Sequence, residues 1–158
     1  MEELAKKVGK RLKSSQAILV TAESCTGGWV AQALTSVSGS SDWFERGFVT
    51  YSNDSKQEML GVRGDTLARH GAVSEETARE MAQGALARSK GTVALAVTGV
   101  AGPGGGSGAK PVGTVCFAWA SRHAVKSETQ RFSGDRESVR RQSVIRALEG
   151  VLQQLGGG

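Results

Sequence analysis

Two uninterrupted apolar runs, residues 17–21 (AILVT) and 93–98 (VALAVT), constrain the fold of this chain most strongly. Neither run alternates apolar with polar side chains, and such continuous runs are typical of strands that are buried on both faces. A segment with helical periodicity precedes each run, at residues 2–14 and at residues 74–91. Helices that alternate with doubly buried strands indicate an α/β fold with a largely parallel sheet.

The remaining predicted elements extend this pattern, and the last two predicted strands pair through a turn near Ser121. We predict a single domain over residues 1–155, an α/β three-layer fold in which a mixed, mostly parallel sheet carries helices on both faces. Residues 156–158 are predicted to be a flexible tail. The other predicted elements are helices from Ser24 to about 35, at 54–60 and at 136–155, and strands at 43–51, 112–120 and 124–132, the last at a sheet edge.

Composition narrows the classes of function. Hydrophobic residues make up 39% and charged residues 22%, which is a globular balance, and the formal net charge is +5. Lysine and arginine are spread along the chain with few aromatic residues between them, so we expect a small anionic ligand and no nucleic acid. The sequence has no apolar stretch of the roughly 18–20 residues that span a membrane and no secretory leader. We therefore expect a cytoplasmic protein with no membrane partner.

The sulfur and imidazole groups are too few for a metal cluster or a disulfide framework. Cys25 and Cys116 are predicted to be small buried side chains, and His70 and His123 to be surface loop residues. No metal and no cofactor are therefore expected. A Ser-His-Asp triad is also hard to build, because its base would have to be one of these two isolated histidines.

Three segments rich in hydroxyl groups and glycines follow predicted strands, at residues 21–28, 51–56 and 98–106. Ligands of α/β sheets bind beyond the carboxyl ends of the strands, so the three segments are expected to meet there. Hydroxyl groups and free backbone N–H groups suit an anion or a carbonyl group. The sequence therefore predicts the functional site at this edge of the sheet.

Ser24 is a candidate nucleophile, because it lies where the first strand turns into a predicted helix. Backbone N–H groups at such a turn, for example those of Thr26 or Gly27, favour the negative charge of a tetrahedral intermediate. The alternative is that Ser24 is a helix N-cap without a chemical role.

Lys56 is a candidate base, because it follows the second of these strands by about one turn. A lysine acts as a base only where burial or neighbouring cations lower its pKa from about 10.4 toward about 7–8. Tyr51 and Thr98 are expected to hydrogen-bond the neutral amine. The alternatives are a solvated surface lysine and, for Tyr51, an aromatic residue of the core or of the rim.

The glycine-rich stretch at residues 99–108 carries no valid nucleotide-binding motif. Pro111 follows a G-x-G-x-x-A match at once, so no helix can begin where a dinucleotide fingerprint requires one. The stretch is a mobile lid, a backbone cradle for phosphate or a plain surface loop. Arg136 and Arg140 share a helix face at i,i+4 spacing and suit an anion clamp, with a solvated helix face as the alternative.

Taken together, these stretches resemble the CinA C-terminal domain family, and most closely its stand-alone bacterial members, the nicotinamide mononucleotide amidohydrolases of the PncC type. The resemblance runs in order from about residue 3 to residue 155. The motifs that carry it are AESCTGG at 22–28, WFERGFVTYSN at 43–53, GAVS at 71–74, TGVAGP at 98–103 and KPVGTV at 110–115.

The resemblance implies deamidation of nicotinamide mononucleotide to nicotinate mononucleotide and ammonia, without a metal or other cofactor. It implies Ser24 as the nucleophile, Lys56 as the base and Tyr51 as a further catalytic-site residue. It also implies a homo-oligomer, commonly a dimer, that lacks the N-terminal hydrolase domain of the longer relatives. The implied substrate-binding residues are Thr26, Gly27, Thr98, Gly99, Arg136 and Arg140.

Two functions of other classes are compatible with the sequence. A non-catalytic nucleotide-binding or regulatory module would keep the glycine-rich stretch and the arginines but would tolerate the loss of Ser24. An adaptor would need an exposed apolar patch, and Trp29, Trp43 and Trp119 are all predicted to lie in the core.

Overall fold

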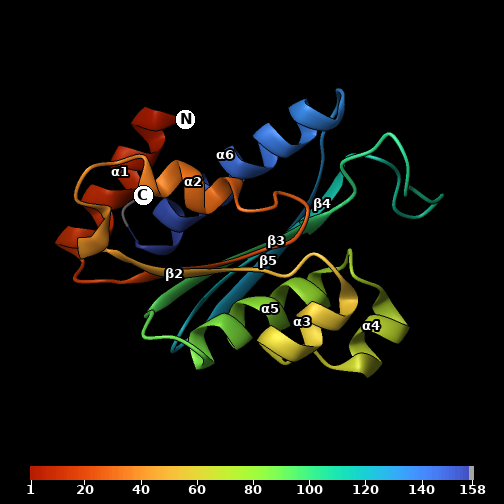
Figure 1. Cartoon of the computed structure of the whole chain (residues 1–158), viewed down its shortest axis with the longest axis horizontal. Coiled ribbons are helices and arrows are strands. Elements are labelled where there is room, and N and C mark those ends of the chain that lie inside the picture. Colours follow the sequence, from red (N-terminus) through yellow and green to blue (C-terminus); the bar gives the residue numbers. More distant parts are fainter. Residues whose placement is uncertain (157–158) are drawn as a thin grey trace.

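The computed structural model describes residues 1–156, and its centre is a five-stranded sheet (Figure 1). The strands are β1 (Leu19–Glu23), β2 (Phe44–Val49), β3 (Val93–Gly99), β4 (Thr114–Ser121) and β5 (Val125–Arg131). They lie in the order β2-β1-β3-β4-β5. β1 pairs in parallel with β2 and β3, whereas β4 is antiparallel to β3 and β5. Every strand except β4 therefore runs in one direction, which confirms the predicted mixed sheet.

Burial of the strands follows the sequence pattern. All of β1 is buried, and so is β3 as far as Thr98, as the continuous apolar runs predict. β5 mixes exposed with half-buried residues and forms one edge of the sheet, which confirms the predicted edge strand. β2 forms the other edge.

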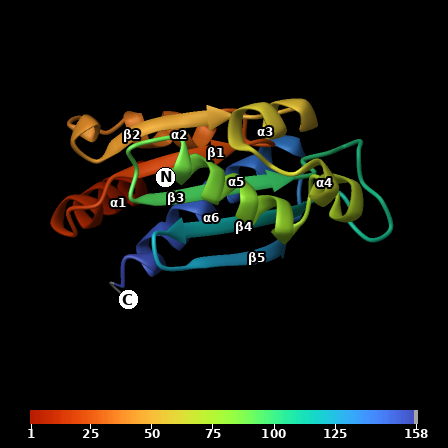
Figure 2. The same cartoon turned by 90° about the horizontal axis from the view of Figure 1, so that it is seen from below.

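Helices cover both faces of the sheet, so the chain has the predicted three layers (Figure 2). A hydrophobic cluster fills the space between the sheet and each helical layer. The helices on one face are α1 (Glu2–Ser14), α2 (Trp29–Thr35) and α6 (Arg136–Gln154), and those on the other are α3 (Asn53–Leu60), α4 (Gly64–His70) and α5 (Glu75–Ala87).

Serine caps fix the start of two helices that later prove to build the site. Ser52 caps α3, where its side chain and that of Ser55 exchange hydrogen bonds with each other's backbone N–H groups. Ser74 caps α5 by accepting from the Thr77 N–H. Both helices therefore begin within one residue of the predicted position.

Two helices differ from the prediction. α2 begins at Trp29 and not just after Ser24, because Gly27 and Gly28 have φ angles of 57° and 103°, which a right-handed helix does not contain. The sequence pattern does not predict α4 at all. That helix has seven residues with only Thr66 buried, so it has no apolar stripe to reveal it.

Two of the three tryptophans lie in the core as predicted. Trp43 and Trp119 are buried, whereas Trp29 is only partly buried. Of the predicted tail, residues 157–158 lie outside the described residues. Among residues 1–156, no helix has the length and apolar character needed to cross a lipid bilayer.

Candidate active site

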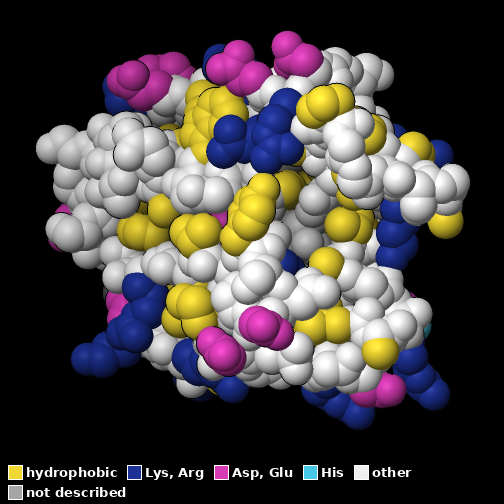
Figure 3. Space-filling model, turned by 45° about the vertical axis from the view of Figure 1, so that its right-hand side comes forward, with side chains coloured by type: hydrophobic (Ala, Val, Ile, Leu, Met, Phe, Trp, Pro, Cys, Tyr) yellow, Lys and Arg dark blue, Asp and Glu magenta, His cyan; other side chains and the backbone are white. Residues whose placement is uncertain are grey.

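The carboxyl ends of β1, β2 and β3 meet at one edge of the sheet, as predicted, and a cavity of about 300 Å³ opens there. The segments that follow the three strands contribute Ser24, Lys56 and Gly99 to its lining, and Arg136 at the start of α6 adds a further side. Figure 3 brings this end of the sheet forward, and basic side chains lie beside hydrophobic ones across the middle of that face. The cavity is therefore suited to a ligand with anionic and apolar parts.

Ser24 and Lys56 meet inside this cavity. The Lys56 Nζ lies 3.0 Å from the Ser24 Oγ. Ser24 follows β1 directly, and Lys56 occupies the first turn of α3, whose direction the Ser52 cap fixes. Lys56 is 1% exposed and Ser24 is 8% exposed, so both groups are shielded from bulk water.

Two backbone carbonyls hold the Lys56 amine from its other side. Its Nζ lies 3.0 Å from the Thr50 O and 3.2 Å from the Tyr51 O. A neutral amine has two N–H donors and one lone pair, so it can donate to both carbonyls while the lone pair faces the Ser24 hydroxyl. Among residues 1–156, no carboxylate forms an ion pair with Lys56. Burial lowers the pKa of Lys56 from its ordinary value, which favours the neutral base.

The predicted side-chain partners of this amine are wrong. Tyr51 contributes its backbone carbonyl and not its phenol. Thr98 donates its hydroxyl to the Ala72 O at 2.9 Å and so ties the segment before α5 to β3. The reason is that α3 folds back directly after β2, which brings the carbonyls of the connecting residues to the amine first.

Glu23 fixes the turn that carries Ser24. Its carboxylate is 1% exposed and accepts hydrogen bonds from the Thr26 Oγ1 at 2.5 Å and the Gly28 N at 3.2 Å. It also accepts from the Val30 N at 2.9 Å and the Ala31 N at 3.0 Å, and so caps α2. The Glu23 O meanwhile accepts from the Thr50 N at 2.8 Å. One residue therefore positions both the serine turn and the strand end whose carbonyl holds Lys56.

Arg140 fixes the same turn from the opposite side. Its Nε donates to the Cys25 O at 3.1 Å and its Nη2 donates to the Thr26 O at 3.0 Å. Its guanidinium also lies 5.4 Å from the centre of the Trp29 ring. Arg140 does not line the cavity, because these backbone carbonyls engage it behind the turn. The expectation that Arg140 binds substrate directly is therefore not met by its position.

Thr26 and Gly27 also lie in the turn and do not line the cavity. The Thr26 side chain is buried on Glu23, and the Gly27 N–H already donates to the Ser24 O at 3.1 Å. Of the two predicted oxyanion donors, only the Thr26 N–H has no acceptor among residues 1–156. Burial raises the pKa of the neighbouring Cys25 thiol to about 12, so this thiol is almost entirely protonated at neutral pH.

The Arg136 side chain binds different partners from Arg140, although both residues lie on one face of α6. Its Nη1 donates to the Gly102 O at 2.8 Å and its Nη2 donates to the Tyr51 Oη at 3.2 Å. Tyr51 is 62% exposed and lies at the rim of the cavity. Arg136 and Tyr51 thus form a basic and aromatic rim next to the glycine-rich stretch.

Gly99 allows the strands to approach behind this rim. A Cβ atom at Gly99 would lie 2.8 Å from the Thr114 O, which leaves no room for a side chain. Only glycine therefore fits at this point of the cavity wall.

Two lining residues and one supporting residue are not singled out by the sequence. Asn53 lies one helical turn before Lys56, and this spacing is a signal that could have found it. Val73 lies in the link before α5 and carries no chemical signal. Glu23 ends a buried strand, where a carboxylate needs hydrogen-bond partners, and that requirement points to its role. Within residues 1–156, no three His, Cys, Asp or Glu side chains are placed to hold a metal ion.

This chain resembles known proteins both in sequence and in structure. The model of the CinA C-terminal domain family matches residues 1–155. The nicotinamide-nucleotide amidohydrolase PncC of Escherichia coli (strain K12) is 54% identical over 154 residues, which cover 96% of this chain and 93% of that protein. The protein of the same name from Pseudomonas putida is 55% identical over 150 residues, 95% of this chain and 94% of that protein. Among solved structures, the competence/damage inducible protein CihA from Agrobacterium tumefaciens has a TM-score of 0.94 at 48% identity, over 98% of this chain and 94% of that one.

Proposed function

The chain belongs to the CinA C-terminal domain family, and we propose that it is a nicotinamide-nucleotide amidohydrolase that deamidates nicotinamide mononucleotide through Ser24 and Lys56. The two PncC relatives are more than half identical to this chain over nearly all of both proteins, which supports the activity. The observation that carries the mechanism is the buried contact of 3.0 Å between the Lys56 Nζ and the Ser24 Oγ.

The proposed reaction passes through an ester of Ser24. Lys56 accepts the Ser24 proton as the Oγ attacks the carboxamide carbon, and the Lys56 ammonium then gives that proton to the leaving nitrogen. Ammonia departs, and the nicotinoyl group of the nucleotide remains bound to the Ser24 Oγ as an ester. Water attacks this ester with Lys56 again as the base. The proton returns to the Ser24 Oγ as nicotinate mononucleotide is released.

The surroundings supply charge stabilisation and substrate binding. The free Thr26 N–H is the donor proposed for the oxyanion of the tetrahedral intermediate. Arg136 retains N–H donors beyond its two observed hydrogen bonds and is proposed to bind the phosphate. Thr98 and Gly99 shape the wall beside the nucleotide, whereas Arg140 acts through the turn that it fixes. Binding of the remote phosphate helps to position the amide for attack.

The test is ammonia release from nicotinamide mononucleotide by the purified, EDTA-treated protein. We expect Ser24→Ala and Lys56→Ala each to lower kcat at least about 10³-fold, and the double variant to lose no more than either single one, because the two groups act as a unit. Ser38→Ala and Lys126→Ala, both at exposed positions, are the matched controls and should retain full activity. Near-normal turnover by Ser24→Ala would refute the mechanism.

An inactive wild-type protein would have a different meaning. If the folded wild type released no ammonia but bound the nucleotide, a non-catalytic nucleotide-binding module would replace the enzyme as the best account. Location in the cytoplasm stays a prediction of the sequence, and assembly as a homo-oligomer stays a prediction of the family resemblance. Light scattering of the purified protein measures the second of these, and a monomer would contradict it.

A further inference from the structure

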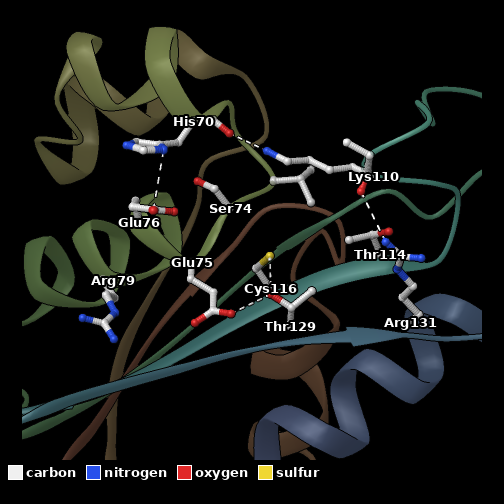
Figure 4. Close-up of a pocket in the computed structure, with 12 residues that line it drawn as sticks. His70, Ser74, Glu75, Glu76, Arg79, Lys110, Thr114, Cys116, Thr129 and Arg131 are labelled. Atoms are coloured by element: carbon white, nitrogen blue, oxygen red, sulfur yellow. Dashed lines mark hydrogen bonds and ion pairs between the residues drawn. The ribbon is translucent and has the colours of Figure 1, made fainter.

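A second cavity, of about 630 Å³, lies on the side of the sheet that α4 and α5 cover (Figure 4). It is about twice as large as the cavity at Ser24. Cys116 on β4 and Thr129 on β5 form its floor, and the start of α5 forms one wall. The loop that contains the glycine-rich stretch ends at the opposite wall, at Ala109 and Lys110. The proposed reaction uses none of these four features.

Acidic groups gather on one side of this cavity. Glu75 and Glu76 are in the first turn of α5. The Glu75 carboxylate is held in place by the Ser127 and Thr129 hydroxyls, each at 2.8 Å. Glu76 is half exposed and lies 3.5 Å from the His70 Nδ1. Arg79 lies further along α5, where its Nε donates to Ser127 at 2.7 Å. This side therefore offers two carboxylates to a cationic group, with the Arg79 guanidinium beside them.

Basic groups gather on the other side, at the end of the glycine-rich stretch. The Lys110 ammonium donates to the His70 O, and the Arg131 Nη2 donates to the Ala109 O at 3.3 Å. Each of these contacts uses one donor, so an ammonium keeps two N–H donors and a guanidinium keeps four. In Figure 4 both side chains come from the side opposite Glu75 and Glu76. Both carboxylates of the cavity thus lie on one side, and Lys110 and Arg131 lie on the other.

Between the two charged sides the lining is uncharged. Val73 and Ala109 contribute aliphatic surface, Ser74, Thr114 and Thr129 contribute hydroxyl groups, and burial raises the pKa of the Cys116 thiol. A flat ring can rest on such a surface. The volume lies within the range of about 300–1,000 Å³ that is typical of small-molecule sites.

We propose that this cavity is a second binding site for a pyridine nucleotide in its oxidised form, with the pyridinium ring beside Glu75 and Glu76 and the phosphate between Lys110 and Arg131. The choice of ligand class rests on the proposed function, because a pyridinium nucleotide carries a ring cation at one end and a phosphate at the other. A ligand with this distribution of charge matches both sides of the cavity, whereas a simple anion would face the two carboxylates unpaired.

The second site shares walls with the first. Val73 lines both cavities, and the link from Gly71 to Ser74 contacts Thr98 through the Ala72 O. The loop that contains the glycine-rich stretch lines the Ser24 cavity at Gly104 and Gly105 and the second cavity at Ala109 and Lys110. The two cavities are therefore neighbours that share part of their walls.

The experiment is calorimetric titration of the Ser24→Ala protein, which cannot turn over, with nicotinamide mononucleotide. We expect two binding events per chain. Glu76→Gln and Arg131→Gln, each in the Ser24→Ala background, should weaken one event about five- to tenfold and leave the other unchanged. Glu58→Gln and Arg69→Gln make the same charge changes at exposed positions outside both cavities, and should alter neither event.

The reduced nucleotide, whose dihydropyridine ring is uncharged, provides a matched ligand. It should bind the second site several-fold more weakly, and Glu76→Gln should remove this preference. A single binding event per chain would overturn the proposal. Equal binding of the oxidised and reduced forms, or displacement by inorganic phosphate at equal affinity, would overturn it in favour of a plain anion site. Failure of the proposed function is distinguishable, because it would appear as absent ammonia release by the wild type.

Discussion

The two glycine-containing segments that border the active site differ in how firmly they are held. In the turn from Ser24 to Gly28, the residues Ser24, Cys25 and Thr26 are buried, and Glu23 and Arg140 bond the turn from both sides. In the loop that contains the glycine-rich stretch, residues 103–109 are all exposed, and side chains from elsewhere bond it only at the Gly102 O and the Ala109 O.

This difference assigns different tasks to the two segments. A nucleophile has to be held to a fraction of an ångström, so it belongs on a turn that several hydrogen bonds from outside it hold in place. A segment that admits and covers a nucleotide has to move, so few tertiary contacts suit it. Glycine serves both segments through positive φ angles, at Gly27 and Gly28 in the turn and at Gly102 and Gly105 in the stretch.

The largest effect should come from loosening the turn. Glu23→Gln places an NH₂ group against N–H donors of α2 and leaves a buried donor unpaired. We expect the free energy of unfolding to fall by about 2–4 kcal/mol and kcat to fall about 10²-fold, with KM nearly unchanged.

Denaturant unfolding and steady-state kinetics measure these two effects. Glu2→Gln, at an exposed position on α1, is the control and should change neither quantity. A raised KM at normal kcat would contradict the view that the turn positions Ser24 for the chemical step.

The pH dependence of the rate sharpens the comparison. Because burial lowers the pKa of Lys56, the neutral base persists to lower pH than a free lysine would allow. Below this lowered pKa the amine gains a proton, and kcat/KM should fall about tenfold per pH unit. Lys126→Ala, at an exposed position on β5, should leave the profile unchanged. A profile that shifts with Lys126→Ala would contradict the assignment of this titration to Lys56.

The same pKa shift predicts how stability varies with pH. The unfolded chain keeps the Lys56 proton up to its ordinary pKa, whereas the folded chain releases it at lower pH. Between these two pKa values the unfolded state binds more protons, so the free energy of unfolding should rise with pH. Denaturant titrations of the wild type and Lys56→Met measure the difference, and an equal slope for both would contradict a lowered pKa.

A smaller effect should come from loosening the rim. Arg136→Gln removes the contacts to the Tyr51 Oη and the Gly102 O, together with the charge proposed to bind phosphate. We expect KM to rise about tenfold while kcat stays within about twofold of the wild type, because the turn is untouched. Arg141→Gln, exposed on the same helix, is the matched control. A large loss of kcat without a change in KM would assign Arg136 to the chemistry instead of to binding.

Much of the fold and the central pair of the site could be predicted from the sequence. The runs of β1 and β3 are continuous, without the alternation of a half-buried strand, and the carboxyl ends of parallel strands must meet. Ser24 and Lys56 follow such strands directly, so chain connectivity alone brings them to one edge.

The distinct tasks of Arg136 and Arg140 could not be predicted. Their i,i+4 spacing places both on one face of α6, but one guanidinium reaches the rim and the other lies against Trp29 behind the turn. Which partner each side chain finds depends on carbonyl groups from remote parts of the chain. The hydrogen-bond partners of the Lys56 amine could not be predicted for the same reason. They are backbone carbonyls, which no sequence pattern marks.

The buried thiol beside the nucleophile has a consequence for the conditions under which the protein can work. Cys25 follows Ser24 directly, and burial raises the pKa of its thiol to about 12. Oxidants and alkylating agents react with thiolates, and a thiol of this pKa is almost entirely protonated at neutral pH. The cysteine therefore fills space without adding reactivity, and the hydroxyl chemistry next to it should be indifferent to the redox state of its surroundings.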